Sequence, residues 1–104
     1  TKRVNVRGNN NAKDLKAVAY INPVKKLSYI NVRNLPNLPE DQSFQMWAEV
    51  NGKMIDLGII DKSTGQEKLL ALPYGEHAVS YITIEPKGGN NTPTIKNIVA
   101  KIDY

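Results

Sequence analysis

The side chains that could carry out chemistry in this sequence are few. His77 is the single histidine, beside Glu76 in a loop-like segment, and the chain has no cysteine. A metal site needs several ligands at defined spacing, so His77 is interpreted as a surface-loop histidine. The lack of cysteine also removes thiolate metal sites and cysteine nucleophiles. We therefore predict that the chain binds no metal and no other cofactor.

Other catalytic arrangements have no positive support in the sequence. No serine lies in a Gly-x-Ser-x-Gly elbow, and a Ser-His-Asp arrangement would have to be built on His77. Paired carboxylates carry out glycoside hydrolysis, and the candidates are Glu40, Asp41, Asp56, Asp61 and Glu85. The carboxylate separation that catalysis requires is not fixed by sequence, and acidic residues are common in turns. We predict that the chain is not an enzyme.

Neither the glycines nor the charges indicate a phosphate or nucleic-acid site. Gly88 and Gly89 precede a predicted strand rather than a helix, and no Lys-Ser or Lys-Thr follows them, which excludes a P-loop. The net charge is +4, with basic clusters near Arg3 and at Lys25. A nucleic-acid groove would interleave basic residues with stacking aromatics on one face. That pattern is absent, so we interpret the charges as solvated surface and predict no nucleic-acid partner.

The length of the chain indicates one small domain. The 104 residues suffice for a single core, and we predict one domain spanning residues 1–104. No run of about 18 apolar residues is present, so no segment is expected to span a membrane. The sequence begins at Thr1 rather than Met and shows no signal peptide. We expect either a mature form or an excised piece of a longer protein.

Short apolar runs rich in Val, Ile and Tyr alternate with turn signals along the whole chain. This pattern is typical of an antiparallel β-sandwich, and we predict an immunoglobulin-like one of about seven or eight strands. The strands are predicted at residues 2–7, 15–21, 26–34, 43–50, 53–60, 67–71, 78–85 and 95–103.

One hairpin can be predicted in detail. Asn51-Gly52 between two apolar runs favours a two-residue type I′ turn, because both residues tolerate positive φ. That loop length fixes the register and is expected to place one set of apolar side chains on a single buried face: Phe44, Met46, Ala48, Ile55, Leu57 and Ile59.

The same register places Trp47 on the opposite face, across from Asp56 and diagonal to Gly58, where a glycine leaves room for the indole. We expect the ring to be covered, because tryptophan is highly buried on average.

In the hairpin around residues 22–25 the register stays open. There Val18, Tyr20, Leu27 and Tyr29 compete for the core with Ala17, Ile30 and Val32.

An LP-x-LP-type segment leads into an aromatic-Gln-aliphatic-Trp strand, and a later Glu-Pro-x-Gly-Gly precedes a Thr-Pro turn. Motifs in this order resemble those of the C-terminal domain of bacterial anti-sigma-K factors. The resemblance is specific between about residues 35 and 94, weaker at Tyr20 with Asn22-Pro23, and absent from the first dozen residues. The residues that carry it, which we expect to be structural, are Leu35, Pro36, Leu38, Pro39, Phe44, Gln45, Trp47, Gly58, Glu85, Pro86, Gly88, Gly89 and Pro93.

The resemblance implies a function and a location. Members of that family are single-pass membrane proteins whose cytoplasmic region binds an extracytoplasmic-function sigma factor. The domain seen here would lie outside the cytoplasmic membrane, on its periplasmic or cell-surface side, after a membrane helix absent from this sequence. It would be a non-enzymatic sensor or regulatory domain, with a protease or envelope protein as partner. The sigma factor would not bind this domain.

A second function from another class stays open on the residues. The domain could be a carbohydrate- or peptide-binding module of a secreted or surface protein. Trp47, Tyr74 and Tyr81 would supply a sugar-stacking platform if they were exposed together.

Overall fold

The computed structural model describes residues 2–22, 24–25, 27–60, 70–72 and 79–103, with the backbone alone at residues 27 and 70–72. Regular structure in these ranges is almost entirely β. The strands are β1 (Lys2–Arg7), β2 (Lys16–Asn22), β3 (Leu27–Asn34), β4 (Gln42–Val50), β5 (Lys53–Ile60), β6 (Leu70–Leu72), β7 (Val79–Pro86) and β8 (Ile98–Asp103), and the 3-10 helix η1 (Ile95–Asn97) precedes the last. No helix in these ranges is long and apolar enough to cross a membrane.

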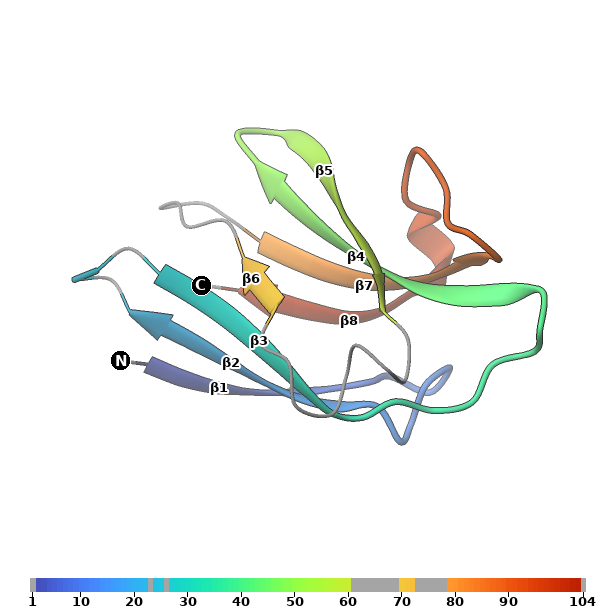
Figure 1. The fold of residues 1–104 in the computed structure, drawn as a ribbon, viewed down its shortest axis with the longest axis horizontal. Helices are drawn as coiled ribbons and strands as arrows, with labels where there is room; N and C mark the ends of the chain where they lie inside the picture. The colour runs from blue at the N-terminus through green and yellow to red at the C-terminus, as the bar shows by residue number, and fades with distance from the viewer. Residues whose placement is uncertain (1, 23, 26, 61–69, 73–78, 104) are drawn as a thin grey trace.

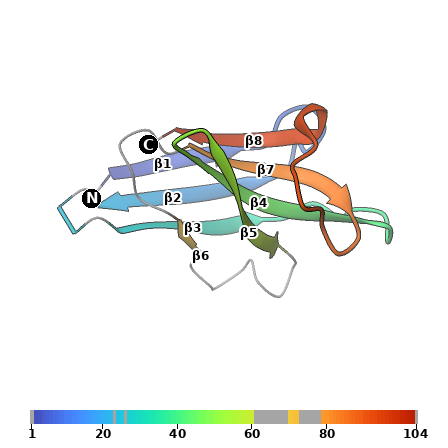
Figure 2. The ribbon, with the colours of Figure 1, turned by 90° about the horizontal axis from the view of Figure 1, so that it is seen from above.

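The strands form two antiparallel sheets of four strands, ordered β1-β2-β3-β6 and β5-β4-β7-β8. Figures 1 and 2 show the sheets as two layers. The all-β, two-sheet prediction is confirmed. Immunoglobulin constant domains order their first sheet A-B-E-D, whereas β1, β2 and β3 are consecutive neighbours here. An immunoglobulin-like topology is therefore not confirmed.

The core lies between the two sheets and follows from the alternation of side chains along each strand. The first sheet contributes small and branched residues, among them Ala17, Ala19, Ile30 and Val32. The second sheet contributes the aromatic Phe44 and the long Met46 together with small and branched residues. From β5, β7 and β8 the latter are Ile60, Ile82, Val99, Ala100 and Ile102.

The hairpin between β4 and β5 forms as its turn chemistry predicts. Asn51 and Gly52 both have positive φ, 52° and 79°. Val50 pairs with Lys53, Ala48 with Ile55, and Trp47 with Asp56. The predicted turn and the first part of the predicted register are confirmed.

A bulge at Leu57 corrects the rest of that register. Met46 pairs with Gly58 rather than Leu57, and Phe44 with Ile60 rather than Ile59. Gly58 takes a φ of +107°, which glycine adopts readily and other residues rarely do. The extra residue reverses the side-chain alternation beyond it.

The bulge redistributes the predicted buried face. Ile60 enters the core, whereas Ile59 moves to the outer face beside Gln45. Leu57 is half-buried and packs against the core, and Ile55, near the turn, is 43% exposed. Ile59 does not share the face of Met46, and Ile55, although it pairs with Ala48 as predicted, is not buried; for these two residues the prediction of one buried face is wrong. Gly58 also does not make room for the indole, because a Cβ there would meet nothing within 4 Å; the backbone conformation accounts for the glycine.

The first hairpin settles the register that the sequence left open. Ala17 pairs with Val32 and Ala19 with Ile30, and all of these side chains are buried in the core. Tyr20 pairs with Tyr29, and both lie half-buried on the outer face. The small alanines leave space between the sheets for the larger side chains of β4.

The predicted final strand begins too early. Residues 95–97 form η1, and the strand starts at Ile98. The backbone N–H of Asn97 donates to the carbonyl of Thr94 at 2.9 Å, and this contact closes a helical turn that extended backbone would not make. The part of the predicted strand 67–71 that precedes β6 lies outside the described residues.

Candidate functional site

The outer face of the sheet β5-β4-β7-β8 carries an unusual set of buried polar side chains. Since Phe44, Met46 and Ala48 point into the core, Gln45 and Trp47 of β4 point away from it. Yet Gln45, Trp47, Thr83 and Glu85 are each at most 1% exposed. The segment between β7 and η1 rises on this outer side of the sheet, as the orange-to-red loop of Figure 1 shows. The prediction that the Trp47 ring is covered is confirmed.

A chain of hydrogen bonds runs from the indole to this loop. Trp47 Nε1 donates to Thr83 Oγ1 at 2.8 Å, and that hydroxyl donates to Glu85 Oε2 at 2.6 Å. The carboxylate then holds Thr94, whose backbone N–H donates to Oε2 at 2.9 Å and whose hydroxyl donates to Oε1 at 2.7 Å. Asn97 Nδ2 donates to the carbonyl of Ile84 at 3.2 Å, which adds a second attachment near the end of the loop.

Gln45 holds the other end of the loop. Its Oε1 accepts the backbone N–H of Asn90 at 2.9 Å, and its Nε2 donates to the Asn90 carbonyl at 3.1 Å. Nε2 also donates to Asp56 Oδ1 at 2.9 Å, and that oxygen accepts the Gly58 N–H at 2.8 Å. The Gln45 amide therefore pairs with the loop backbone as a neighbouring strand would. We call Gln45, Thr83, Glu85, Asn90 and Thr94 the clasp.

Two glycines allow the loop to approach the sheet closely. Gly88 and Gly89 have φ of +88° and +90°, and the Gly89 N–H donates to the Pro86 carbonyl at 2.9 Å. A Cβ on Gly89 would lie 2.8 Å from Ile59 Cδ1 and 2.9 Å from Gln45 Oε1, whereas one on Gly88 would meet nothing within 4 Å. Position 89 thus favours glycine for conformation, and a side chain there would also displace the ends of Ile59 and Gln45.

Glu85 is held as a carboxylate. Burial by itself raises its pKa, but hydrogen bonds from the Thr83 hydroxyl and from the backbone and hydroxyl of Thr94 favour the ionised form and outweigh burial. The net effect is a pKa below the ordinary glutamate value. A general acid needs the opposite shift, a raised pKa. The arrangement therefore fastens a loop and does not prepare Glu85 for proton transfer.

The other candidate catalytic, metal-binding and sugar-binding residues do not gather around Glu85. Glu40 and Asp41 are exposed in the turn before β4, and the one Asp56 contact to the clasp is that with Gln45. The described residues contain no group of three or more His, Cys, Asp or Glu that could hold a metal ion. His77, Glu76, Asp61 and Tyr74 lie outside the described residues. Because Trp47 is buried, the sugar-stacking platform proposed on Trp47, Tyr74 and Tyr81 lacks its tryptophan.

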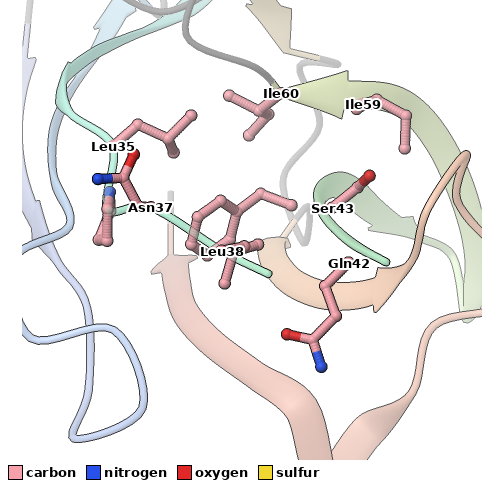
Figure 3. Close-up of a pocket in the computed structure, with 9 residues that line it drawn as sticks. Leu35, Asn37, Leu38, Gln42, Ser43, Ile59 and Ile60 are labelled. Carbon is pink, nitrogen blue, oxygen red and sulfur yellow. The ribbon is translucent and has the colours of Figure 1, made fainter. Parts of the chain in front are cut away.

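The Leu-Pro segment before β4 forms a second cluster, shown in Figure 3. Leu35 and Leu38 are half-buried and pack against the core. With Pro36, Phe44 and Ile60 they line a shallow depression whose rim carries the uncharged polar residues Asn37, Gln42 and Ser43. No residue lining it is titratable, so it offers no acid or base. Pro39 is exposed, and its carbonyl accepts the Gln42 N–H at 3.0 Å at the start of β4.

The structure brings most of the sequence-predicted motif residues into two clusters. Gln45 and Glu85 are clasp residues, Trp47 lies beneath them, Pro86 ends β7, and Gly88, Gly89 and Pro93 belong to the loop that the clasp holds. Sequence reasoning missed Thr83, Asn90 and Thr94. Thr83 could have been found, since it lies two residues before Glu85 and must share its face. Asn90 is held through its backbone N–H and carbonyl, and Thr94 through its backbone N–H as well as its hydroxyl. Contacts of backbone groups leave no sequence signal.

The family of the chain follows from comparison with protein-family models. The model described as "Anti-sigma-K factor rskA, C-terminal" matches residues 1–98. The chain belongs to this family, and the match extends to the N-terminal residues in which the motifs gave no signature. Proteins of this family are membrane-associated anti-sigma factors with a regulatory role. Comparison with curated proteins and comparison with solved structures gave no match.

Proposed function

We propose that this chain is the non-enzymatic regulatory domain of a membrane-anchored anti-sigma factor that controls an extracytoplasmic-function sigma factor. The observation that carries the proposal is the family match over residues 1–98. In the full-length protein the domain lies on the periplasmic or cell-surface side of the membrane, after an upstream membrane helix. A separate cytoplasmic region binds the sigma factor, and this domain does not.

The buried polar groups support a mechanical role. The side chains of Gln45 and Glu85 hold the loop, and hydrogen bonds from Thr83 and Thr94 keep Glu85 ionised. A domain of this kind influences a sigma factor across the membrane through the chain that connects them. We propose that the folded sandwich, or a partner bound to it, controls access of a protease to the segment before residue 1.

The physical basis is the difference in stability between the domain and its linker. Proteases cut backbone that can open into an extended conformation, which a hydrogen-bonded sheet does rarely and an exposed linker does often. A stable domain beside the membrane therefore shields the linker, and a signal that loosens or displaces the domain exposes it.

The test is deletion of residues 1–104 from the full-length protein with the membrane helix retained. We expect higher basal expression from a promoter read by the cognate sigma factor, because the shield is gone. As a control, an unrelated stable domain of similar size in the same place should restore repression but not the response to the inducing stress. A truncated protein that inserts normally and leaves sigma-dependent expression unchanged under all stresses would refute the proposal.

A further inference from the structure

The two sheets differ in charge. No strand of the sheet β1-β2-β3-β6 contains an aspartate or a glutamate. The cations on these strands are Lys2, Arg3, Arg7, Lys16 and Arg33. The opposite sheet carries the cations Lys53 and Lys101 and the carboxylates Glu49, Asp56, Glu85 and Asp103. The positive charge of the strands is therefore concentrated on one layer of the sandwich.

Four of these cations share the outer face of their sheet. Val4, Val6 and Ala17 point toward the core, so Arg3, Arg7 and Lys16 point outward. Arg33 joins them, because it lines the same surface depression as Arg7 and Lys16. All four are exposed. We call Arg3, Arg7, Lys16 and Arg33 the basic face.

Two of the arginines are held over this face by an aromatic residue. The Arg3 guanidinium lies 5.9 Å from the centre of the Tyr20 ring, and Arg33 Nη2 donates to the Tyr20 hydroxyl at 3.3 Å. Each retains further N–H donors, and the planar guanidinium matches the geometry of a phosphate. Ordering of the side chains before binding reduces the entropy lost when they bind.

The spacing indicates an array of anions rather than one bound phosphate. Arg3 and Arg7 lie on one extended strand four residues apart, which is about 13 Å. Two side chains so separated contact different phosphates. A broad sheet face with several arginines and no strand carboxylate is complementary to a surface of phosphate groups.

We propose that the basic face of this domain rests on the anionic phospholipid headgroups of the membrane that anchors the protein. The inference rests on the proposed function, because a membrane anchor keeps the domain close to the headgroup surface. A cluster of basic residues next to an anionic bilayer is attracted to it, and the attraction falls with added salt. Contact of this kind orients the sandwich with the clasp sheet away from the membrane and the linker beneath the domain.

The experiment measures binding of the 104-residue chain to vesicles by co-sedimentation. We expect binding to vesicles of equal parts phosphatidylglycerol and phosphatidylcholine, weak binding to phosphatidylcholine alone, and loss of binding at about 0.5 M salt. The test variant is Arg3→Gln/Arg7→Gln/Arg33→Gln, expected to lower affinity about tenfold or more. The matched control is Lys53→Gln/Lys87→Gln/Lys96→Gln, which removes the same charge from exposed positions off the basic face and should keep most of the binding.

Equal losses in the two triple variants would overturn the proposal, because net charge alone would then explain the binding. Binding to a soluble polyphosphate without binding to vesicles would also overturn it, in favour of a soluble polyanion. If the test triple does not fold, Arg7→Gln with Lys16→Gln replaces it, since neither side chain takes part in the Tyr20 contacts. The vesicle assay involves no sigma factor, so its failure and that of the deletion experiment are distinguishable.

Discussion

Glu85 holds Thr94 by both carboxylate oxygens. Oε2 accepts the backbone N–H at 2.9 Å and Oε1 accepts the hydroxyl at 2.7 Å, across nine residues of chain. The contact joins the end of β7 to the far end of the loop that covers Trp47. We therefore expect the stability of the domain to depend strongly on this one buried carboxylate.

Glu85→Gln should lower the free energy of unfolding by about 2–3 kcal/mol, because hydrogen bonds to a charged acceptor are replaced by weaker neutral ones and one acceptor oxygen becomes a donor. Urea unfolding followed by circular dichroism measures the change. The matched control is Glu49→Gln, on the adjacent strand of the same sheet, which should change stability by less than about 0.5 kcal/mol. Similar losses in both variants would contradict the role of Glu85.

The same carboxylate makes the stability of the domain fall at acid pH. The pKa of Glu85 is lowered in the folded protein, so below the ordinary value of 4.5 the unfolded state takes up a proton before the folded state does. Stability is fully present above that ordinary value and is lost as the pH falls through the folded pKa. Unfolding midpoints measured from pH 7 down to pH 2.5 should fall more steeply in the parent than in Glu85→Gln. Parallel curves for the two proteins would show that other groups cause the loss of stability at acid pH.

Gly89 and Gly88 form a matched pair for the fit of the loop. Alanine at either position adopts an unfavourable positive φ, a cost of about 1–3 kcal/mol. Only at position 89 does the added Cβ also meet Ile59 and Gln45 at under 3.0 Å. Because these contacts are to the ends of side chains that can shift, Gly89→Ala should lose about 1 kcal/mol more than Gly88→Ala, as measured by thermal unfolding. Equal melting temperatures would mean that the loop does not pack on Gln45 as described.

Trp47 is the single tryptophan of the chain, so its fluorescence reports on the covered face. In the folded protein its emission should be blue-shifted and poorly quenched by acrylamide, because the ring is 0% exposed. Trp47→Ala should cost about 3–5 kcal/mol, as for other buried aromatics. Strong quenching in the native state, together with an unchanged melting temperature in Trp47→Ala, would instead place the ring in solvent.

Local chemistry accounts for the parts of the fold that the sequence predicted. Asn51-Gly52 specifies its own turn, and the strict register of a two-residue loop then pairs Trp47 with Asp56. Trp47 on the face opposite the core, and the need to cover it, follow from the same register. These features depend on residues close together in the chain, where turn geometry and alternation act directly.

Tertiary context decides the parts that were wrong or missed. The bulge at Leu57 exchanges Ile59 for Ile60 in the core, and a single glycine in the sequence does not distinguish a bulge from a gap left for the indole. Besides the Thr94 hydroxyl, the clasp depends on backbone groups of Asn90 and Thr94. The positions of these backbone groups are set by the loop as a whole, and residue types do not encode them.

If the folded sandwich controls proteolytic access to the linker, as we propose, graded destabilisation of the full-length protein should expose the linker by degrees. Gly88→Ala, Glu85→Gln and Gly89→Ala are introduced singly, and expression from the sigma-dependent promoter is measured without stress. We expect expression to rise in the order of the measured losses in unfolding free energy, with Glu49→Gln at the parental level. Expression at the parental level in all three variants, with protein present in normal amounts and the losses in stability confirmed, would contradict it.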